Sequence, residues 1–381
     1  MLLTFQQNNV INNAEENKEG PFLSAPSRFA GRGPRPRVRV GVAGCGAFGR
    51  HHARIYSQLE AAELTGVYDA DRGRAQAVAA EYGARATASL DELIEACDAI
   101  SLAAPTAAHA ELGCRILRSG RDLLVEKPIA ASLDEADALL AAAGRERILQ
   151  VGHLERFNPA VRALRPRLTR PMFFEVHRMS VFTPRSLDID VLLDLMIHDL
   201  DLVLSFAGAE IEQLQAVGLP VITSKVDIAN VRLTLTNGCV ANLTASRVST
   251  ERVRKLRWFQ PGEYISLDYA RQDAHIYALR GPAARLMRGE GAGRAASWIP
   301  ALPHNALTSA AWEALAKASL KHELIKPETQ EPLALELAAF LHSVKTRQPP
   351  EADGQVGRKA LAAALMARDE IERHAQRLGL E

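Results

Sequence analysis

Short β-branched runs alternate with helical segments between residues 37 and 157, and this alternation constrains the fold more than any other feature of the sequence. Strands are expected at 37–44, 62–70, 98–105, 121–128 and 148–157, with helices at 46–59, 75–83, 90–97, 109–120 and 132–147. Strands that alternate with helices at this spacing are typical of a parallel, doubly wound sheet. The sequence therefore predicts an α/β domain over residues 37–157.

The pattern changes after residue 158. Strand-like runs then follow one another at 172–182, 211–223, 227–248, 255–270 and 274–279, with hairpin turns expected at Asn237-Gly238 and Pro261-Gly262. We expect a second α/β domain at 158–350 built on a large, mostly antiparallel open sheet, and a C-terminal helix within 351–381. Residues 283–330 show no clear pattern. Residues 1–36, rich first in Asn, Gln and Glu and then in Pro, Gly and Arg, read as a disordered, dispensable extension.

Composition excludes several classes of partner. A formal net charge of +1 gives no basic field for nucleic acid or an anionic membrane. No run of about 18 apolar residues is present, so no membrane-spanning helix is expected. The four cysteines are widely scattered without metal-ligand spacing, which predicts free thiols and a cytoplasmic location. A small-molecule ligand is the expected partner.

The segment GCGAFG carries the pattern GxGxxG between the first strand and the first helix. We expect the backbone of Gly44, Gly46, Ala47, Phe48 and Gly49 to hold a pyrophosphate at the helix N-terminus. Asp69 follows about twenty residues later at the end of the second strand, where a carboxylate binds ribose hydroxyls and repels a 2′-phosphate. The predicted cofactor is therefore NAD, although Arg72 and Arg74 leave room for a phosphate. His51 and His52 read as surface or phosphate-side residues.

The apolar run VLLDLMIHDLDLVL at 191–204 carries Asp194, His198 and Asp201 on one face of a predicted helix, with Asp190 one turn earlier. Buried carboxylates need a polar partner, so this face is expected at the active site. Neutral imidazole suits proton transfer near neutral pH. A metal site and a purely structural polar pair are the alternatives for Asp194 and His198.

Lys127 lies in the tripeptide Glu126-Lys127-Pro128 at the carboxyl end of a predicted parallel strand, where open α/β sheets bind their ligands. An ammonium group there can donate a hydrogen bond to a substrate hydroxyl and stabilise a developing alkoxide. Lys127 and His198 are therefore expected to handle the substrate proton together, and which of them is the base stays open. Pro128 is a candidate for a cis peptide bond.

Five motifs in this order resemble the Gfo/Idh/MocA family of NAD(P)-dependent sugar and cyclitol oxidoreductases over essentially the whole chain after residue 37. They are the glycine loop, AAPTAAHAEL at 103–112, VEKPIA at 125–130, GHLERFNP at 152–159 and the DLMIH segment. The resemblance implies a Rossmann domain and a second domain whose open sheet forms a homodimer or homotetramer. It also implies Lys127, Asp194 and His198 as catalytic residues, and Pro105, Thr106, His109, Glu126 and Lys127 as cofactor contacts.

The chain departs from the common family pattern at Ile189, Asp190 and Met196, where many members carry glycine. Together with GHLERFNP, these positions resemble a branch that oxidises the 3-hydroxyl of UDP-N-acetylglucosamine for lipid A biosynthesis. This branch implies His153, Arg156 and Asn158 as substrate-binding residues and no metal. Oxidation of a free sugar or inositol is the alternative substrate class. A nucleotide-binding sensor without catalysis is the alternative of another kind, and the presence of both Lys127 and His198 speaks against it.

Overall fold

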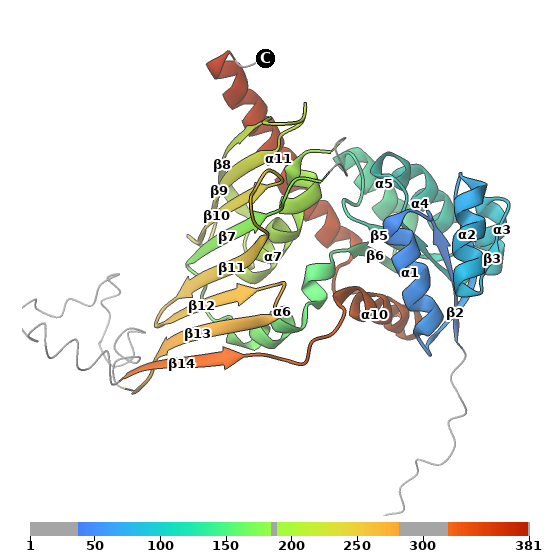
Figure 1. The fold of residues 1–381 in the computed structure, drawn as a ribbon, viewed down its shortest axis with the longest axis horizontal. Helices are drawn as coiled ribbons and strands as arrows, with labels where there is room; N and C mark the ends of the chain where they lie inside the picture. The colour runs from blue at the N-terminus through green and yellow to red at the C-terminus, as the bar shows by residue number, and fades with distance from the viewer. Residues whose placement is uncertain (1–36, 184–188, 282–318, 380–381) are drawn as a thin grey trace, which may run out of the picture. The chain divides into compact units, whose positions relative to one another are not determined.

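A computed structural model describes residues 37–183, 189–281 and 319–379, so the expectation for residues 1–36 lies outside the described residues. The first sheet, on the right in Figure 1, is parallel throughout and has the strand order β3-β2-β1-β4-β5-β6. This order is that of a dinucleotide-binding Rossmann fold. Its strands are β1 Val38–Ala43, β2 Ala62–Tyr68, β3 Arg85–Ala86, β4 Ala99–Leu102, β5 Asp122–Glu126 and β6 Leu149–Gly152.

Five helices connect these strands, as the alternation in the sequence predicts. They are α1 Ala47–Gln58, α2 Arg72–Tyr82, α3 Leu90–Ala96, α4 His109–Arg118 and α5 Leu133–Ala143. The last predicted strand is shorter than expected, because β6 ends at Gly152 and residues Leu154–Phe157 form a 3₁₀ helix. Asn158 then caps α6, Pro159–Leu164, by accepting a hydrogen bond from Ala160 N.

The second sheet has eight strands in the order β14-β13-β12-β11-β7-β10-β9-β8, and all its pairs are antiparallel except the parallel pair β7·β10. Both predicted hairpin turns form, with Gly238 and Gly262 at positive φ. The edge strand β14 lies in the stretch where the sequence shows no pattern. The strands are β7 Phe173–Met179, β8 Ile211–Leu219, β9 Ile228–Leu235, β10 Val240–Ser246, β11 Val253–Gln260, β12 Glu263–Asp268, β13 Asp273–Leu279 and β14 Leu320–Ile325.

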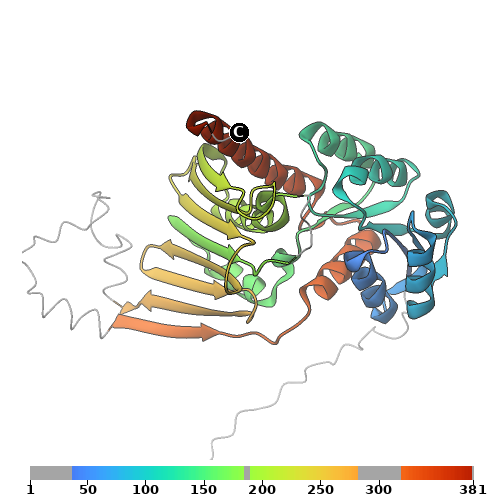
Figure 2. The ribbon, with the colours of Figure 1, turned by 45° about the horizontal axis from the view of Figure 1, so that its top comes forward.

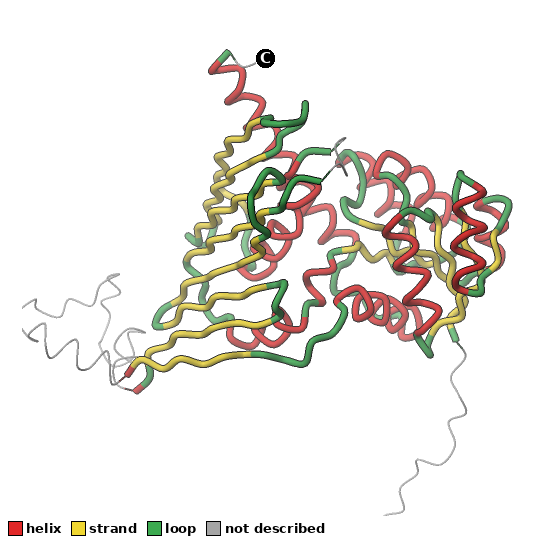
Figure 3. Tube along the Cα trace, viewed as in Figure 1, coloured by secondary structure: helices red, strands yellow, loops and turns green. Residues whose placement is uncertain are grey.

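Helices α7, Ile197–Ala207, and α11, Gly354–Leu378, lie on one face of the second sheet (Figures 2 and 3). Helix α11 also contacts the Rossmann domain, because Gly354 and Gly357 let it approach β6 closely: a Cβ atom on Gly357 would lie 2.5 Å from Val151. The predicted C-terminal helix is thus present, and it packs on both sheets.

Helix α10, Pro332–Thr346, falls within the range that the sequence assigned to the second domain. The structure instead packs its buried Leu337, Phe340 and Leu341 with Val40 and Tyr56 in the core of the Rossmann domain. The sequence boundary misplaced this helix because apolar periodicity reports a buried face but not the sheet that covers it.

All four cysteines are buried free thiols, as their spacing predicts. None of the helices in the described ranges has the length and apolar character to cross a bilayer.

Candidate active site

The glycine loop joins β1 to α1, and its glycines are required for different reasons. Gly44 has φ +96°, and a Cβ atom there would lie 2.5 Å from the carbonyl oxygen of Ala103; a Cβ on Gly49 would lie 1.7 Å from the carbonyl of Gly44. The protein's own backbone therefore excludes side chains at both positions. A Cβ on Gly46, in contrast, would meet no protein atom within 4 Å. The open space at Gly46, beside the first turn of α1, fits a pyrophosphate that approaches the backbone closely.

Asp69 directly follows β2 and faces the same loop. Its Oδ2 accepts a hydrogen bond from Cys45 N at 2.7 Å, and its Oδ1 accepts one from Asp71 N at 2.7 Å. These two backbone donors fix the carboxylate beside the glycine loop, and each oxygen keeps a lone pair for a ribose hydroxyl. The residues present thus fit the adenosine half of NAD. Ala47 and Phe48, at the start of α1, have exposed side chains.

Replacing Asp69 by Ser should weaken NAD binding and relatively favour NADP, because the variant loses both the ribose acceptor and the charge that repels a 2′-phosphate. Comparing the affinities of the native protein and the variant for the two cofactors by fluorescence titration checks this prediction. A native protein that binds NADP more tightly than NAD would contradict it.

Three sequence-predicted cofactor residues lie on the segment after β4. Pro105 is exposed, and Thr106 begins a short 3₁₀ turn. His109 is buried, with Nδ1 2.9 Å from the carbonyl of Pro128 and Nε2 2.9 Å from the carbonyl of Ala104. Both ring nitrogens are therefore occupied by backbone, so His109 ties this segment to the segment after β5 and has no nitrogen left for the cofactor.

Glu126 at the end of β5 is buried and forms a 2.9 Å hydrogen bond with Nε2 of His52 on α1. Burial alone would raise the pKa of Glu126, but the contact with His52 lowers it. The reading of His52 as a surface residue is wrong, because the sequence shows two adjacent histidines without showing which one points inward. The pair links the helix of the glycine loop to the Glu126-Lys127-Pro128 segment, whose Lys127–Pro128 peptide bond is cis.

Lys127 reaches from the Rossmann domain to the second domain. Its Nζ donates a hydrogen bond to the backbone carbonyl of Asp194 at 2.7 Å and lies 3.4 Å from Asp194 Oδ1. Only 10% of the Lys127 side chain and 27% of the Asp194 side chain are exposed. The structure thus brings together two of the three residues predicted to be catalytic, although they lie far apart in the sequence.

The polar segment is not the single α-helix that the sequence predicts. Leu192–Met196 form a π turn, and α7 begins only at Ile197. A π turn interrupts the regular α-helical hydrogen-bond ladder, so a carbonyl in it, here that of Asp194, can accept a hydrogen bond from outside the helix. Asp190 accepts a hydrogen bond from Leu193 N at 2.9 Å and so caps the start of this turn.

His198 is buried beside His153, with ring centroids 6.3 Å apart and planes at 90°. Burial lowers the pKa of His198 well below its ordinary value, and the charges of Lys127 and Arg178 lower it further. Burial also lowers the pKa of His153. Nδ1 of His198 and both ring nitrogens of His153 are enclosed without a hydrogen-bond partner among the described residues. Both rings are therefore neutral at physiological pH, and a neutral imidazole can accept a proton.

The two aspartates of α7 are held in buried ion pairs. Asp201 accepts two hydrogen bonds from Arg156 at 2.6 and 2.7 Å, and Asp199 accepts two from Arg178 at 2.6 and 2.9 Å. Asn158 donates to the carbonyl of Tyr269 at 3.0 Å. Arg156 and Asn158 thus make structural contacts, and substrate binding by either residue stays a prediction. The sequence could not separate these aspartates from Asp194, since their partners lie in distant segments.

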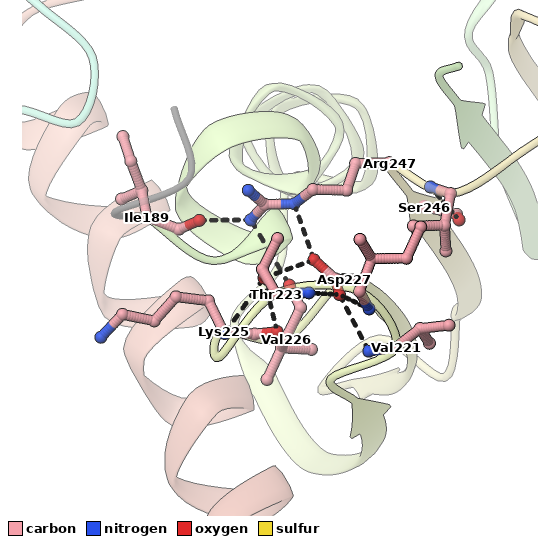
Figure 4. Close-up of polar contacts among 10 residues, drawn as sticks. Ile189, Val221, Thr223, Lys225, Val226, Asp227, Ser246 and Arg247 are labelled. Atoms are coloured by element: carbon pink, nitrogen blue, oxygen red, sulfur yellow. Dashed lines mark hydrogen bonds and ion pairs between the residues drawn. The ribbon is translucent and has the colours of Figure 1, made fainter. Parts of the chain in front are cut away.

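A buried carboxylate and guanidinium hold the segment that leads into the π turn (Figure 4). Arg247 donates to the carbonyl of Ile189, and its Nε lies 3.4 Å from Asp227 Oδ1. Burial would raise the pKa of Asp227, but hydrogen bonds, chiefly from the backbone and hydroxyl of Thr223, lower it to about 2. Val191 N also donates to the carbonyl of Val226 at 3.1 Å. These contacts position the chain just before Asp194.

We expect the free energy of unfolding to fall as the pH drops below about 6.5. Burial lowers the pKa of His109, His153 and His198, so the unfolded chain takes up protons in this range that the folded protein excludes. Each of these histidines that stays neutral in the folded state should contribute about 1.4 kcal/mol per pH unit to the loss. Urea unfolding at several pH values measures the slope. In the His153→Asn variant this slope should be smaller by the contribution of about one proton. An unchanged slope in that variant would contradict the neutral state of His153 in the folded protein.

Within residues 37–183, 189–281 and 319–379, no three His, Cys, Asp or Glu side chains are grouped so that they could bind a metal ion.

The Rossmann strand order and the glycine loop with Asp69 define a two-domain, nicotinamide-dependent oxidoreductase, and Lys127, Asp194 and His198 are its candidate catalytic residues. Models of the oxidoreductase family with an NAD-binding Rossmann fold match residues 38–153, and those of the Gfo/Idh/MocA C-terminal domain match residues 160–259. The chain belongs to the Gfo/Idh/MocA oxidoreductase family, as its motifs predict, and its cofactor is NAD.

Individual relatives agree with this assignment. The UDP-N-acetylglucosamine 3-dehydrogenase of Acidithiobacillus ferrooxidans is 38% identical over 342 residues, which cover 89% of this chain and 99% of the relative. A solved structure of that enzyme has a TM-score of 0.76 at 36% identity and covers 89% of this chain and 99% of its own. Inositol 2-dehydrogenase 2 of Saccharopolyspora erythraea is 31% identical over 186 residues, 46% of this chain and 55% of the relative. Levoglucosan dehydrogenase in complex with NADH shares the fold, with a TM-score of 0.73 at 15% identity, and covers 89% of this chain and 98% of its own.

Proposed function

We propose that the chain oxidises the 3-hydroxyl of UDP-N-acetylglucosamine to the 3-keto sugar nucleotide, with NAD as the oxidant. The observation that carries this proposal is the 38% identity to an enzyme named for that reaction, over 99% of that enzyme. The geometry supports an alcohol dehydrogenation, because Lys127 at the carboxyl end of the Rossmann sheet contacts Asp194, and its charge acts on the buried imidazole of His198 one turn further along the chain.

Lys127 and His198 have different roles in the proposed reaction. The Lys127 ammonium donates to the substrate oxygen and stabilises negative charge on it as the hydroxyl proton leaves. His198, kept neutral by burial and by nearby cations, accepts that proton. Asp194 holds Lys127 through its carbonyl and carboxylate and accepts hydrogen bonds from sugar hydroxyls. NAD, when bound, supplies the acceptor for the hydride that leaves the same carbon.

A free sugar or an inositol is the second candidate substrate, and the 31% identity to an inositol 2-dehydrogenase favours it. That similarity covers only 55% of the relative, whereas the similarity to the nucleotide-sugar enzyme is end to end. We therefore rank the nucleotide sugar first.

Incubating the purified protein with NAD and a panel of compounds tests the function. The panel contains UDP-N-acetylglucosamine, UDP-glucose, N-acetylglucosamine and myo-inositol, and the absorbance of reduced NAD reports turnover. We expect the highest kcat/KM with UDP-N-acetylglucosamine and a product lighter by two hydrogens in mass spectrometry. Turnover of myo-inositol or N-acetylglucosamine in preference to the nucleotide sugar would overturn the proposal.

We further propose that the product feeds an aminotransferase in lipid A biosynthesis and that the enzyme acts in the cytoplasm as a homodimer or homotetramer. A row of neighbouring rings on adjacent strands of the second sheet supports assembly through this sheet. The row consists of Phe173, Phe259, Tyr264, Tyr277 and His322. Phe259 and Tyr277 are exposed in the single chain, and their burial against a second copy would stabilise an oligomer. Light scattering after size-exclusion chromatography measures the assembly state, and a monomer would contradict this part of the proposal.

A further inference from the structure

The first residues of β11 place an arginine that the proposed mechanism does not use on the inner face of the second sheet. Arg254 lies directly across from Arg178 of β7 in the antiparallel register. The next inward-facing pairs along the same two strands are Leu256 with Val176 and Trp258 with Phe174, and all four are buried. Arg254 therefore belongs to the face of the sheet that is covered by α7, the helix that contains His198.

The two cross-strand arginines differ in how their charge is compensated. Arg178 donates to both carboxylate oxygens of Asp199 and, at 3.0 Å, to Glu155. Arg254 forms no ion pair with any carboxylate in the described part of the chain, and its Nε is enclosed without a hydrogen-bond partner there. Like charges opposite one another destabilise a sheet, and a partly buried guanidinium without a partner costs free energy. Among the described residues, the charges of Glu155 and Asp199 favour the charged form of Arg254, but neither carboxylate forms an ion pair with it.

The charge of Arg254 reaches the active site. Arg254 is among the groups that lower the pKa of His198, after Lys127, Arg178 and His153. Arg252, two residues earlier, is exposed and adds further positive charge beside Arg254. This region thus contains three guanidinium groups and only two carboxylates. The guanidinium groups are those of Arg178, Arg252 and Arg254, and the carboxylates are those of Glu155 and Asp199. An anionic substrate group that arrives beside His198 enters a region of net positive charge.

Only the Nε atom of Arg254 is among the enclosed, unpartnered atoms, so its two terminal nitrogens keep their donors for a ligand. A planar guanidinium matches two oxygens of a phosphoryl group, and such charge-assisted hydrogen bonds are stronger than neutral ones. Free sugars and inositols carry no group that would compensate this charge, whereas a nucleotide sugar carries a diphosphate.

We propose that Arg254 is the anion-binding residue of the substrate pocket and that its guanidinium binds a phosphoryl group of the substrate's diphosphate, with Arg252 adding longer-range attraction. The inference rests on the proposed function, because it assigns a protein partner to the diphosphate of a nucleotide sugar.

Calorimetric titration of UDP and of inorganic pyrophosphate into the full-length protein saturated with NADH tests the subsite, because the bound cofactor blocks the pyrophosphate site of the glycine loop. In Arg254→Gln, the Kd for both ligands should rise by about 10- to 100-fold, as expected for loss of hydrogen bonds to a charged group. Arg254→Lys, which keeps the charge but not the two-pronged geometry, should show a smaller rise. Lys255→Gln, which changes the next residue on the opposite face of β11, is the matched control and should bind as the native protein does. Uridine, which lacks phosphate, should bind all four proteins equally.

Equal UDP affinity in the native protein and Arg254→Gln would overturn the subsite. Should Arg254→Gln fail to fold, unchanged affinity in a folded Arg254→Lys would overturn it as well. The two proposals can fail separately. If the native protein binds pyrophosphate through Arg254 but does not oxidise UDP-N-acetylglucosamine, the anion-binding subsite is supported and the proposed function is contradicted. If the Arg254→Gln variant oxidises UDP-N-acetylglucosamine with an unchanged KM, the proposed function is supported and the role of Arg254 as an anion-binding residue is contradicted.

Discussion

Replacing Lys127 by Met or His198 by Asn should lower kcat by about 10² to 10⁴ while NAD still binds with near-native affinity. Each substitution removes a group placed for proton transfer or charge stabilisation, and the glycine loop and Asp69 that hold the adenosine half of NAD stay intact. Steady-state turnover together with NAD titration of each variant measures the two effects separately.

Two exposed residues of α10 provide matched controls. Lys345→Met and His342→Asn make the same chemical changes away from the proposed site, because both side chains are solvent-exposed. We expect native turnover in both. A loss of NAD affinity in the Lys127 or His198 variants that matches their loss of turnover would show that the two residues serve the cofactor site or the fold and not the chemical step.

Replacing Asp199 by Ala should lower the free energy of unfolding by about 3–5 kcal/mol, because it leaves the Arg178 guanidinium buried without its main counter-ion. Arg178 and Asp199 are both almost fully buried and share two short hydrogen bonds. Urea unfolding followed by circular dichroism measures the change.

The double variant Arg178→Met with Asp199→Leu removes both charges and should recover much of the lost stability, since apolar residues often replace buried ion pairs with little loss. Asp137→Ala removes an exposed partner of Arg358 and should leave the free energy of unfolding nearly unchanged. A small loss in Asp199→Ala, similar to that of Asp137→Ala, would contradict the role assigned to the buried pair.

Local sequence patterns predicted most of the fold. The alternation of β-branched and helical runs identified the strands and helices of the Rossmann domain, and the glycines at 44, 46 and 49 marked the turn between β1 and α1. The strands of the second sheet were likewise visible in their alternation, apart from β14. Its sequence, LKHELI, has no buried side chain in the chain alone, so it lacks the apolar alternation that marks an internal strand.

The parts of the site that the sequence did not reveal all depend on contacts between distant segments. The π turn at Leu192–Met196 changes which residues of the polar segment share a face, and helical spacing assumed a regular α-helix. Three features depend on another element of the fold. His52 points inward because it contacts Glu126, and Arg156 pairs with Asp201. Arg254 has no ion-pair partner on any described element. Tertiary packing decides these features, and no short-range pattern encodes them.

The central claim is that Lys127 of the Rossmann domain and His198 of the second domain act on one substrate in one site. Single-turnover reduction of bound NAD by UDP-N-acetylglucosamine in Lys127→Met, His198→Asn and the double variant tests it most directly. Residues that serve one proton path are strongly non-additive, so the double variant should react about as slowly as the slower single variant. Losses that multiply in the double variant, or a near-native rate in His198→Asn, would contradict the account.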